Sequence, residues 1–444
     1  MSFQNKLQNN LITAKEILIF SLPIIAGQIG QMLFGVGDVI VAGHYSSLAV
    51  ASIGVASMIF APMLMIGIGM LMCTGPLASQ LKGQGKTDSS LLYNAYYTSF
   101  FVSLILSTIL FFSEFYIGKF NLNPEIIPHV IAFLKVTAFS LFPAFLFQAT
   151  KEYLQAQGKI YVPNAIILIF NVVNVLLNII FMFGFGEFSG YGIVGAAIAT
   201  AVCRFGMAIA IFVYMRSVSE FVVKKNNETI RKILRLGLPI SFTILCEVLI
   251  FATVSVLVGG MTLIASASQN VVMNITSLTF MVPMALGSAI SILVGEQLGK
   301  KSIDGIVRYS TGAITLTIII QLLFMMLYLF LPHLVMGVAT KDQAVILYGG
   351  MLLFWVGVFQ LPDGLQVVLS GVMRGLNQTK IPMILGFISY WIIGLPFGVF
   401  LAYEKHMEAR GLWVGLTIGL TCMCAFLILF YQNRIKKLRQ TIHN

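Results

Sequence analysis

The sequence has little charge. Of its 444 residues only 10% are charged, whereas 58% are hydrophobic, and the mean hydropathy is +0.93. A soluble domain is roughly 25% charged, and a soluble protein this apolar would expose large aggregating patches. The composition therefore excludes a soluble enzyme, a disordered chain and a nucleic-acid-binding module, and we expect no nucleic acid among its partners.

Cysteine pairs and catalytic motifs are also lacking. The five cysteines are an odd number, lie in apolar runs and form no CxxC or His/Cys cluster, so we interpret them as small buried or lipid-facing residues. The absence of GxxxxGK[ST] argues against an ATP-driven pump. Because HExxH and paired Ser/His groups are also missing, we expect no enzyme and no bound cofactor.

Long apolar runs, in contrast, are abundant. A membrane helix needs about 20 mostly apolar residues, and no window alternates in polarity as a barrel strand would. The first run is too long for a signal-peptide core, so we expect it to be a retained helix. The predicted fold class is an all-α integral membrane protein with 12 transmembrane helices. The predicted spans are 15–39, 49–73, 93–113, 127–149, 162–185, 190–214, 235–258, 264–292, 309–331, 345–370, 382–402 and 411–432.

The basic residues are distributed unevenly between the two sides of the membrane. If the N-terminus is cytoplasmic, 21 of the 27 Lys and Arg residues face the cytoplasm and 4 face outside. This positive-inside pattern explains the net charge of +11 and predicts cytoplasmic N- and C-termini. The longest connection separates six spans from six. We therefore predict an N-terminal lobe at 1–215, a cytoplasmic linker at 216–234 and a C-terminal lobe at 235–444.

The two halves of the chain resemble each other. Three pairs of segments match in order at a near-constant separation, which argues for duplication. The pairs are KEILIFSLPI at 15–24 with RKILRLGLPI at 231–240, QLKGQGKTD at 80–88 with QLGKKSID at 297–304, and LQAQGKIYVP at 154–163 with MRGLNQTKIP at 373–382. Because each repeat has an even number of spans, the repeats are parallel. Two six-helix lobes around a central cleft are typical of a secondary transporter, and neither a channel nor an enzyme needs them.

Three acidic residues lie inside predicted spans: Asp38, Glu247 and Asp363. A charge at the centre of a membrane helix costs at least about 2.5–3.5 kcal/mol, so such residues are candidates for function. The duplication did not produce them as pairs, because Asp38 aligns with Val254 and Glu247 aligns with Gln31.

Asp38 is predicted to lie at the depth of several neutral oxygen groups. Asn174 and Asn178 are four residues apart on one helix face, and the next span places Ala196 and Thr200 at a similar depth. Hard cations prefer oxygen ligands, so the cluster predicts a site for Na⁺ or for a proton on the carboxylate. The alternative is that the asparagines only hydrogen-bond helices together.

In the second lobe, Glu247 lies near mid-span and Asp363 follows Pro362, which loosens the helix. Each acid either carries a proton or awaits a cationic ligand. The alternative is a pairing with one of the two basic residues inside spans, Arg204 or Lys135.

The chain resembles the multidrug and toxic compound extrusion (MATE) family over roughly 15–432, and within it the NorM-type bacterial branch, which is marked by acids in spans 1, 7 and 10 together. The segments that carry the resemblance are SLPIIAGQIGQMLFGVGDVIVAGH at 21–44, GIGMLMCTGPLASQLKGQG at 67–85, GLPISFTILCEVLIFA at 237–252 and QLPDGLQVVLSGVMRG at 360–375.

The resemblance implies export of bulky, often cationic or aromatic drugs, coupled to Na⁺ or H⁺ by alternating access of the two lobes. It implies that the ion binds at Asp38, Asn174, Asn178 and Thr200, with a backbone carbonyl from Ala196. It further implies that the second-lobe acids bind ion or substrate. The sequence departs from the family at Phe359, where relatives often have a tyrosine hydroxyl.

The expected setting is a bacterial inner membrane, with the lipid bilayer and small-molecule substrates as partners and a monomer as the oligomeric state. The alternative function is a lipid-linked saccharide flippase of the wider superfamily. Such a flippase is expected to need a more basic cavity, whereas the clear intramembrane charges here are mostly acidic.

Overall fold

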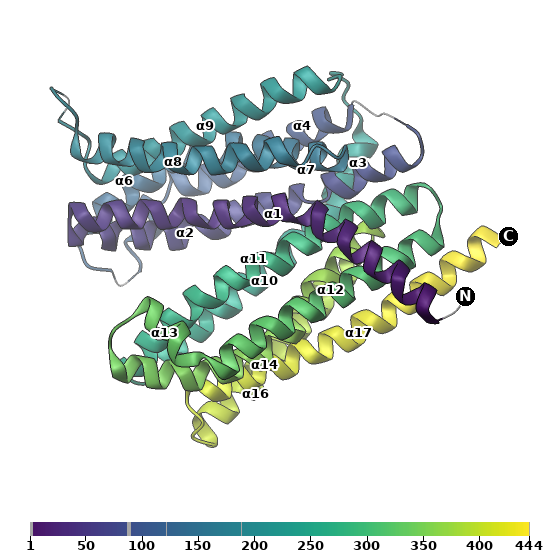
Figure 1. The fold of residues 1–444 in the computed structure, drawn as a ribbon. Helices are drawn as coiled ribbons and strands as arrows, with labels where there is room; N and C mark the ends of the chain where they lie inside the picture. The colour runs from purple at the N-terminus through teal and green to yellow at the C-terminus, as the bar shows by residue number, and fades with distance from the viewer. Residues whose placement is uncertain (1–2, 87–89, 121, 188, 444) are drawn as a thin grey trace. The chain divides into compact units, whose positions relative to one another are not determined.

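The structure of the chain is a computed structural model that describes residues 3–86, 90–120, 122–187 and 189–443. These residues form helices joined by short connections (Figure 1). Among the described residues, eleven helices are long and apolar enough to cross a membrane, and the total is 12 crossings if one bent helix pair counts as a single span. Each predicted span coincides with one of these crossings, so the predicted all-helical membrane fold is confirmed.

The helices have the following bounds. In the first half they are α1 (Phe3–Tyr45), α2 (Ser47–Leu71), α3 (Thr74–Gly83), α4 (Ser90–Phe111), α5 (Glu114–Ile117), α6 (Ile127–Ala138), α7 (Leu141–Ala156), α8 (Tyr161–Phe183) and α9 (Ile193–Val218). In the second half they are α10 (Asn227–Gly259), α11 (Leu263–Gly299), α12 (Ile303–Phe330), α13 (Pro332–Ala339), α14 (Gln343–Gly375), α15 (Lys380–Phe387), η1 (Ile388–Gly394), α16 (Leu395–Val399), η2 (Phe400–Glu404) and α17 (Ala409–His443).

The fourth crossing is bent rather than straight. Helices α6 and α7 meet at an angle of 45°, at Phe139 and Ser140. Pro143 explains the break, because proline has no N–H to donate to the carbonyl four residues earlier, which is that of Phe139. The predicted single span at 127–149 is therefore two helices with a kink.

The described residues pack as two compact units. The first-half bundle consists of the described residues of 26–78 and 86–241; the second-half bundle consists of 3–25, 79–85 and 242–443. The boundaries inside α1 and α10 fall two residues after Pro23 and two residues after Pro239, which the repeat aligns. The first part of each helix thus belongs to the bundle of the other half of the chain. The predicted domain division at 216–234 stays a prediction.

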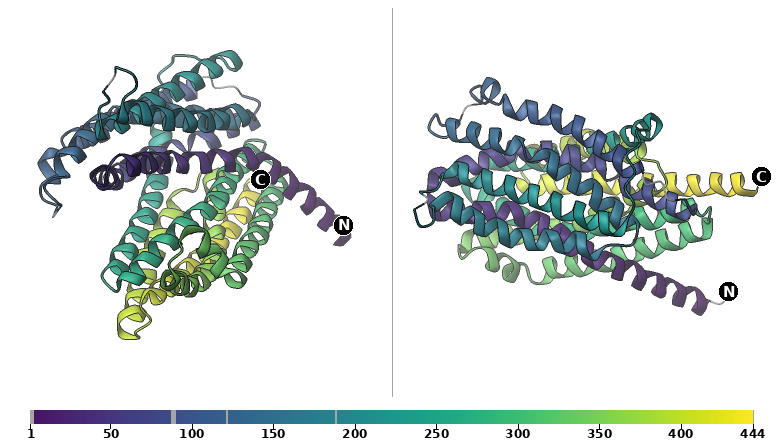
Figure 2. Two further views of the ribbon diagram at one scale, coloured as in Figure 1. Left: turned by 60° about the vertical axis from the view of Figure 1, so that its left-hand side comes forward. Right: turned by 90° about the horizontal axis from the view of Figure 1, so that it is seen from above.

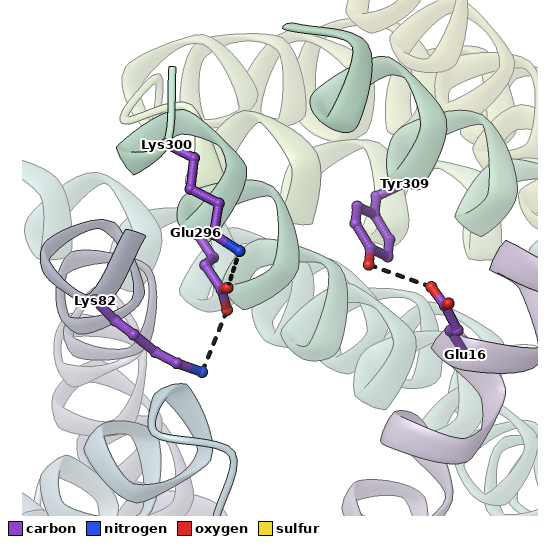
Figure 3. Close-up of polar contacts among 5 residues, drawn as sticks. All are labelled: Glu16, Lys82, Glu296, Lys300 and Tyr309. Carbon is purple, nitrogen blue, oxygen red and sulfur yellow. Dashed lines mark hydrogen bonds and ion pairs between the residues drawn. The ribbon is translucent and has the colours of Figure 1, made fainter. Parts of the chain in front are cut away.

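Within the second-half bundle, α14 packs against α11, α12 and α17 (Figure 2). Two short segments from the first half of the chain are held on this bundle by polar contacts. The Tyr309 hydroxyl donates to Glu16, and Lys82 forms an ion pair with Glu296, which also pairs with Lys300 (Figure 3). These contacts join 3–25 and 79–85 to the second-half bundle.

Candidate functional site

In the first-half bundle, small residues allow α1 to approach α8 closely. A Cβ atom on Gly30 would lie 2.9 Å from a methyl group of Ile167, and one on Gly37 would lie 3.1 Å from a methyl group of Val175. The Asn171 amide donates to the carbonyl of Gly30 at 2.8 Å. A larger side chain at either glycine would push the helices apart, so the glycines bring the polar face of α8 to α1.

This close packing places Asp38 among polar groups of α8 and α9. The Asn178 amide donates to Asp38 Oδ1 at 2.6 Å, and the Thr200 hydroxyl donates to Asp38 Oδ2 at 3.0 Å. The amide of Asn178 also donates to Asn174 Oδ1 at 3.2 Å, and the Asn174 amide approaches the Thr200 hydroxyl at 3.4 Å. The structure therefore brings together the carboxylate, both amides and the hydroxyl that the sequence predicted.

The cluster is buried in the protein. The exposed fraction is 7% for Asp38, 3% for Thr200 and 0% for Asn174 and Asn178. Ala196 is also fully buried, one helical turn before Thr200 on α9. Asn178 Oδ1 is buried and has no hydrogen-bond partner among the described residues. The arrangement thus offers a carboxylate and at least one oxygen that is free to accept a ligand, which fits a hard monovalent cation or a proton.

The three asparagines of α8 differ in their contacts. The amide of Asn171 joins α8 to the backbone of α1. Asn174 and Asn178 instead surround the carboxylate of Asp38. The sequence could not separate these contacts, since all three side chains are amides on one helix.

The two basic residues inside spans have partners within the first-half bundle. Lys135 forms an ion pair with Glu114. Arg204 Nη1 donates to the Ser140 hydroxyl at 2.7 Å, and its guanidinium stacks on the ring of Phe60 at 4.6 Å. These contacts do not support the alternative in which the bases pair with Glu247 or Asp363.

In the second-half bundle, Glu247 lies on α10 and Asp363 on α14. Gln366 Nε2 lies 3.3 Å from Glu247 Oε1, and the Tyr390 hydroxyl lies 3.4 Å from the same oxygen. Gln366 follows Asp363 by three residues on α14, so the residue that contacts Glu247 shares a helix face with Asp363. Asp363 is 1% exposed, and its Oδ1 has no hydrogen-bond partner among the described residues.

Gln366 and Tyr390 were not predicted from the sequence. Gln366 follows Asp363 by three residues, so helical spacing indicated that the two share a face. Tyr390 lies in η1, a π-helical turn, and such turns occur frequently at functional sites. The turn shifts the helical register, so periodicity alone could not place the hydroxyl.

Phe359 lies in an aromatic core rather than beside the acids. It is fully buried, and its ring packs against Trp413 at 5.2 Å and Phe251 at 6.0 Å. The departure from the family at this position therefore replaces a hydroxyl with apolar packing.

Comparison with known proteins identifies the family. The family model described as MatE matches residues 23–180 and 239–400, which together are more than half of the chain. The chain belongs to the MatE family. The same model matches twice, beginning at Pro23 and at Pro239, which supports the duplication inferred from the sequence.

The chain is also similar to individual proteins along nearly its whole length. It is 31% identical to "Probable multidrug resistance protein NorM" of Mannheimia succiniciproducens, with 97% of this chain and 96% of the relative covered. It is 29% identical to a protein of the same name from Pasteurella multocida, with 96% and 95% covered. Among solved structures, the eukaryotic MATE transporter AtDTX14 superposes with a TM-score of 0.87 at 20% identity, covering 98% of this chain and 100% of that chain.

These findings confirm a NorM-type member of the MATE family. Members of this family are transporters, so the expectation that the chain is not an enzyme is confirmed. The chain is a multi-pass membrane protein.

Proposed function

We propose that this protein is a cation-coupled antiporter in a bacterial inner membrane, with both termini cytoplasmic. Na⁺ or H⁺ moves inward in exchange for bulky cationic or aromatic compounds, which are exported by alternating access of the two lobes. The drug-resistance names of the relatives support the substrate class. The acidic character of Asp38, Glu247 and Asp363 supports the cationic nature of the ligands.

The observation that carries this proposal is the polar cluster around Asp38. Its carboxylate is buried and contacts neutral amide and hydroxyl groups. A buried carboxylate costs several kcal/mol unless a cation or proton satisfies it. Asp38, Asn174, Asn178 and Thr200 would hold the coupling ion, which would supply the missing positive charge.

The second-half acids provide the counterpart on the substrate side. Gln366 contacts Glu247 and shares a face of α14 with Asp363, and neither acid forms an ion pair with a basic side chain of the described residues. Either an ion or a cationic drug would neutralise them. Coupling follows if each ligand binds one lobe arrangement better than the other, because only differential affinity shifts a conformational equilibrium.

The lipid-linked saccharide flippase receives less support. A pyrophosphate group would require basic side chains near its site, whereas the charged side chains of the second-half site, Glu247 and Asp363, are acids. The names of the relatives do not favour that alternative.

Efflux from proteoliposomes tests the proposal. The purified protein is reconstituted, a fluorescent cationic aromatic dye is loaded, and inward Na⁺ and proton gradients are imposed separately. We expect one of the two gradients to drive dye export. Collapsing that gradient with an ionophore should stop the export. Export that responds to neither gradient would refute the antiporter.

A matched pair of variants connects the result to the site. Asn178→Ala removes an amide that contacts the carboxylate of Asp38, whereas Asn171→Ala removes an amide that contacts only backbone carbonyls. We expect gradient-driven export to fall at least tenfold in the first variant and to persist in the second. Equal losses in both variants would show that the asparagines only hold helices together.

A further inference from the structure

The first-half site has a positive charge near it that the proposed function does not use. Arg204 lies one helical turn after Thr200 on α9, so the two residues share a helix face. Long side chains in helices point back toward the N-terminus, which here is the direction of Thr200. Thr200 in turn donates to Asp38 at 3.0 Å.

The partners of the guanidinium are neutral. Arg204 donates to the Ser140 hydroxyl and stacks on Phe60, and it forms no ion pair with an acid among the described residues. The acid on this side of α9 is Asp38, which accepts a hydrogen bond from Thr200, one turn before Arg204. Ser140 and Phe60 therefore hold a cation near the carboxylate without neutralising that cation.

A fixed positive charge beside a cation site opposes the binding of a second cation. With Asp38 ionised, the pair of Asp38 and Arg204 is neutral overall, so a bound Na⁺ leaves the region with one net positive charge. One unit charge roughly 10 Å away, at an effective dielectric constant of about 20, changes a binding constant by on the order of tenfold.

We propose that Arg204 is a positioning residue that serves as a fixed counter-charge to Asp38 and weakens cation binding there, so that the site releases its ion. The inference rests on the proposed ion site at Asp38. It assigns Arg204 a role in ion affinity rather than in helix packing. An ion bound too tightly could not leave on the side where its concentration is low, so a weakening charge favours turnover.

The test is direct Na⁺ binding to the purified full-length protein. The thermal unfolding midpoint is measured against NaCl concentration, with choline chloride holding the ionic strength constant. We expect Arg204→Gln to lower the half-saturating Na⁺ concentration about tenfold and Arg204→Lys to leave it near the wild-type value. Asp38→Asn should abolish the Na⁺ response.

A second pair of variants leaves Arg204 in place. Because the Ser140 hydroxyl contacts the guanidinium, Ser140→Asp would neutralise the charge through an ion pair, whereas Ser140→Asn would not. We expect tighter Na⁺ binding in the Asp variant only. An unchanged or weaker affinity in both Arg204→Gln and Ser140→Asp, or no Na⁺ response in any of these proteins, would overturn the inference.

The outcome is separable from that of the proposed function. Tighter Na⁺ binding without gradient-driven export would support the counter-charge and refute the antiporter. Gradient-driven export together with an unchanged Na⁺ affinity in Arg204→Gln and Ser140→Asp would support the antiporter and refute the counter-charge.

Discussion

Replacing Asp38 by asparagine removes the charge of the first-half site while preserving its shape. The new amide oxygen can still accept from Asn178, and the new amide nitrogen can donate to the Thr200 hydroxyl, which would then act as acceptor. Two hydrogen bonds to a charged group, at 2.6 and 3.0 Å, become two neutral ones. Since charged hydrogen bonds contribute about 1.5–3 kcal/mol and neutral ones about 0.5–1.5 kcal/mol, the loss is about 2 kcal/mol.

A compensating gain opposes this loss. The variant no longer buries a carboxylate, whose desolvation costs several kcal/mol. We therefore expect the ion-free variant to be as stable as the wild type within about 2 kcal/mol. The part of the stability that comes from ion binding should vanish. For the wild type this part is about 2.7 kcal/mol when the ion concentration is 100 times the dissociation constant. Drug export should fall to background at normal expression.

Two measurements on the same preparation check this expectation. Thermal unfolding in detergent, with and without the driving ion, gives the stability of the ion-free protein and the stability added by the ion. Dye efflux from proteoliposomes gives the rate of transport. Asn171→Ala is the matched control, because Asn171 contacts the backbone rather than the carboxylate. If Asp38→Asn retained ion-dependent stabilisation and normal efflux, the ion would not bind at Asp38.

Two further substitutions test the packing and the second-half site. A Cβ atom on Gly195 would lie 2.1 Å from the carbonyl oxygen of Phe181, so Gly195→Ala should lower the thermal unfolding midpoint by several degrees. Gly35→Ala is the control and should change the midpoint little, because a Cβ atom there meets open space. Equal midpoints for the two variants would refute the close contact. Tyr390→Phe removes one donor from Glu247 and should slow efflux about 2- to 10-fold without changing the amount of folded protein, and an unchanged rate would show that the hydroxyl has no role.

The helices and the first-half site followed from the sequence because both rest on regular spacing. Apolar runs of membrane-spanning length mark helices whatever they pack against. The interval of four between Asn174 and Asn178 fixes their common face, and the depth of Asp38 follows from counting residues along its helix. The structure adds the close approach of α1 and α8, which depends on glycines whose partners the sequence does not show.

Irregular backbone and tertiary burial were harder to predict. The kink at Ser140 and the π-helical turn at Tyr390 both break the helical period on which the prediction relied. Lys151 is one of the 21 basic residues that the sequence assigns to the cytoplasmic side, and the structure shows it 3% exposed within α7. Its burial depends on neighbouring helices, which a count of charges along one chain does not include.

The equivalent helices α1 and α10 each carry one of the acids, so the positions of Asp38 and Glu247 can be compared. Asp38 follows Pro23 by fifteen residues, whereas Glu247 follows the aligned Pro239 by eight. The difference of seven residues is close to two helical turns, so the two acids occupy nearly the same face of equivalent helices. Along the axis they are displaced by about 10 Å. The two halves thus present carboxylates on equivalent faces at different positions along the helix, which lets one fold provide the proposed ion site in one bundle and a differently placed acidic site in the other.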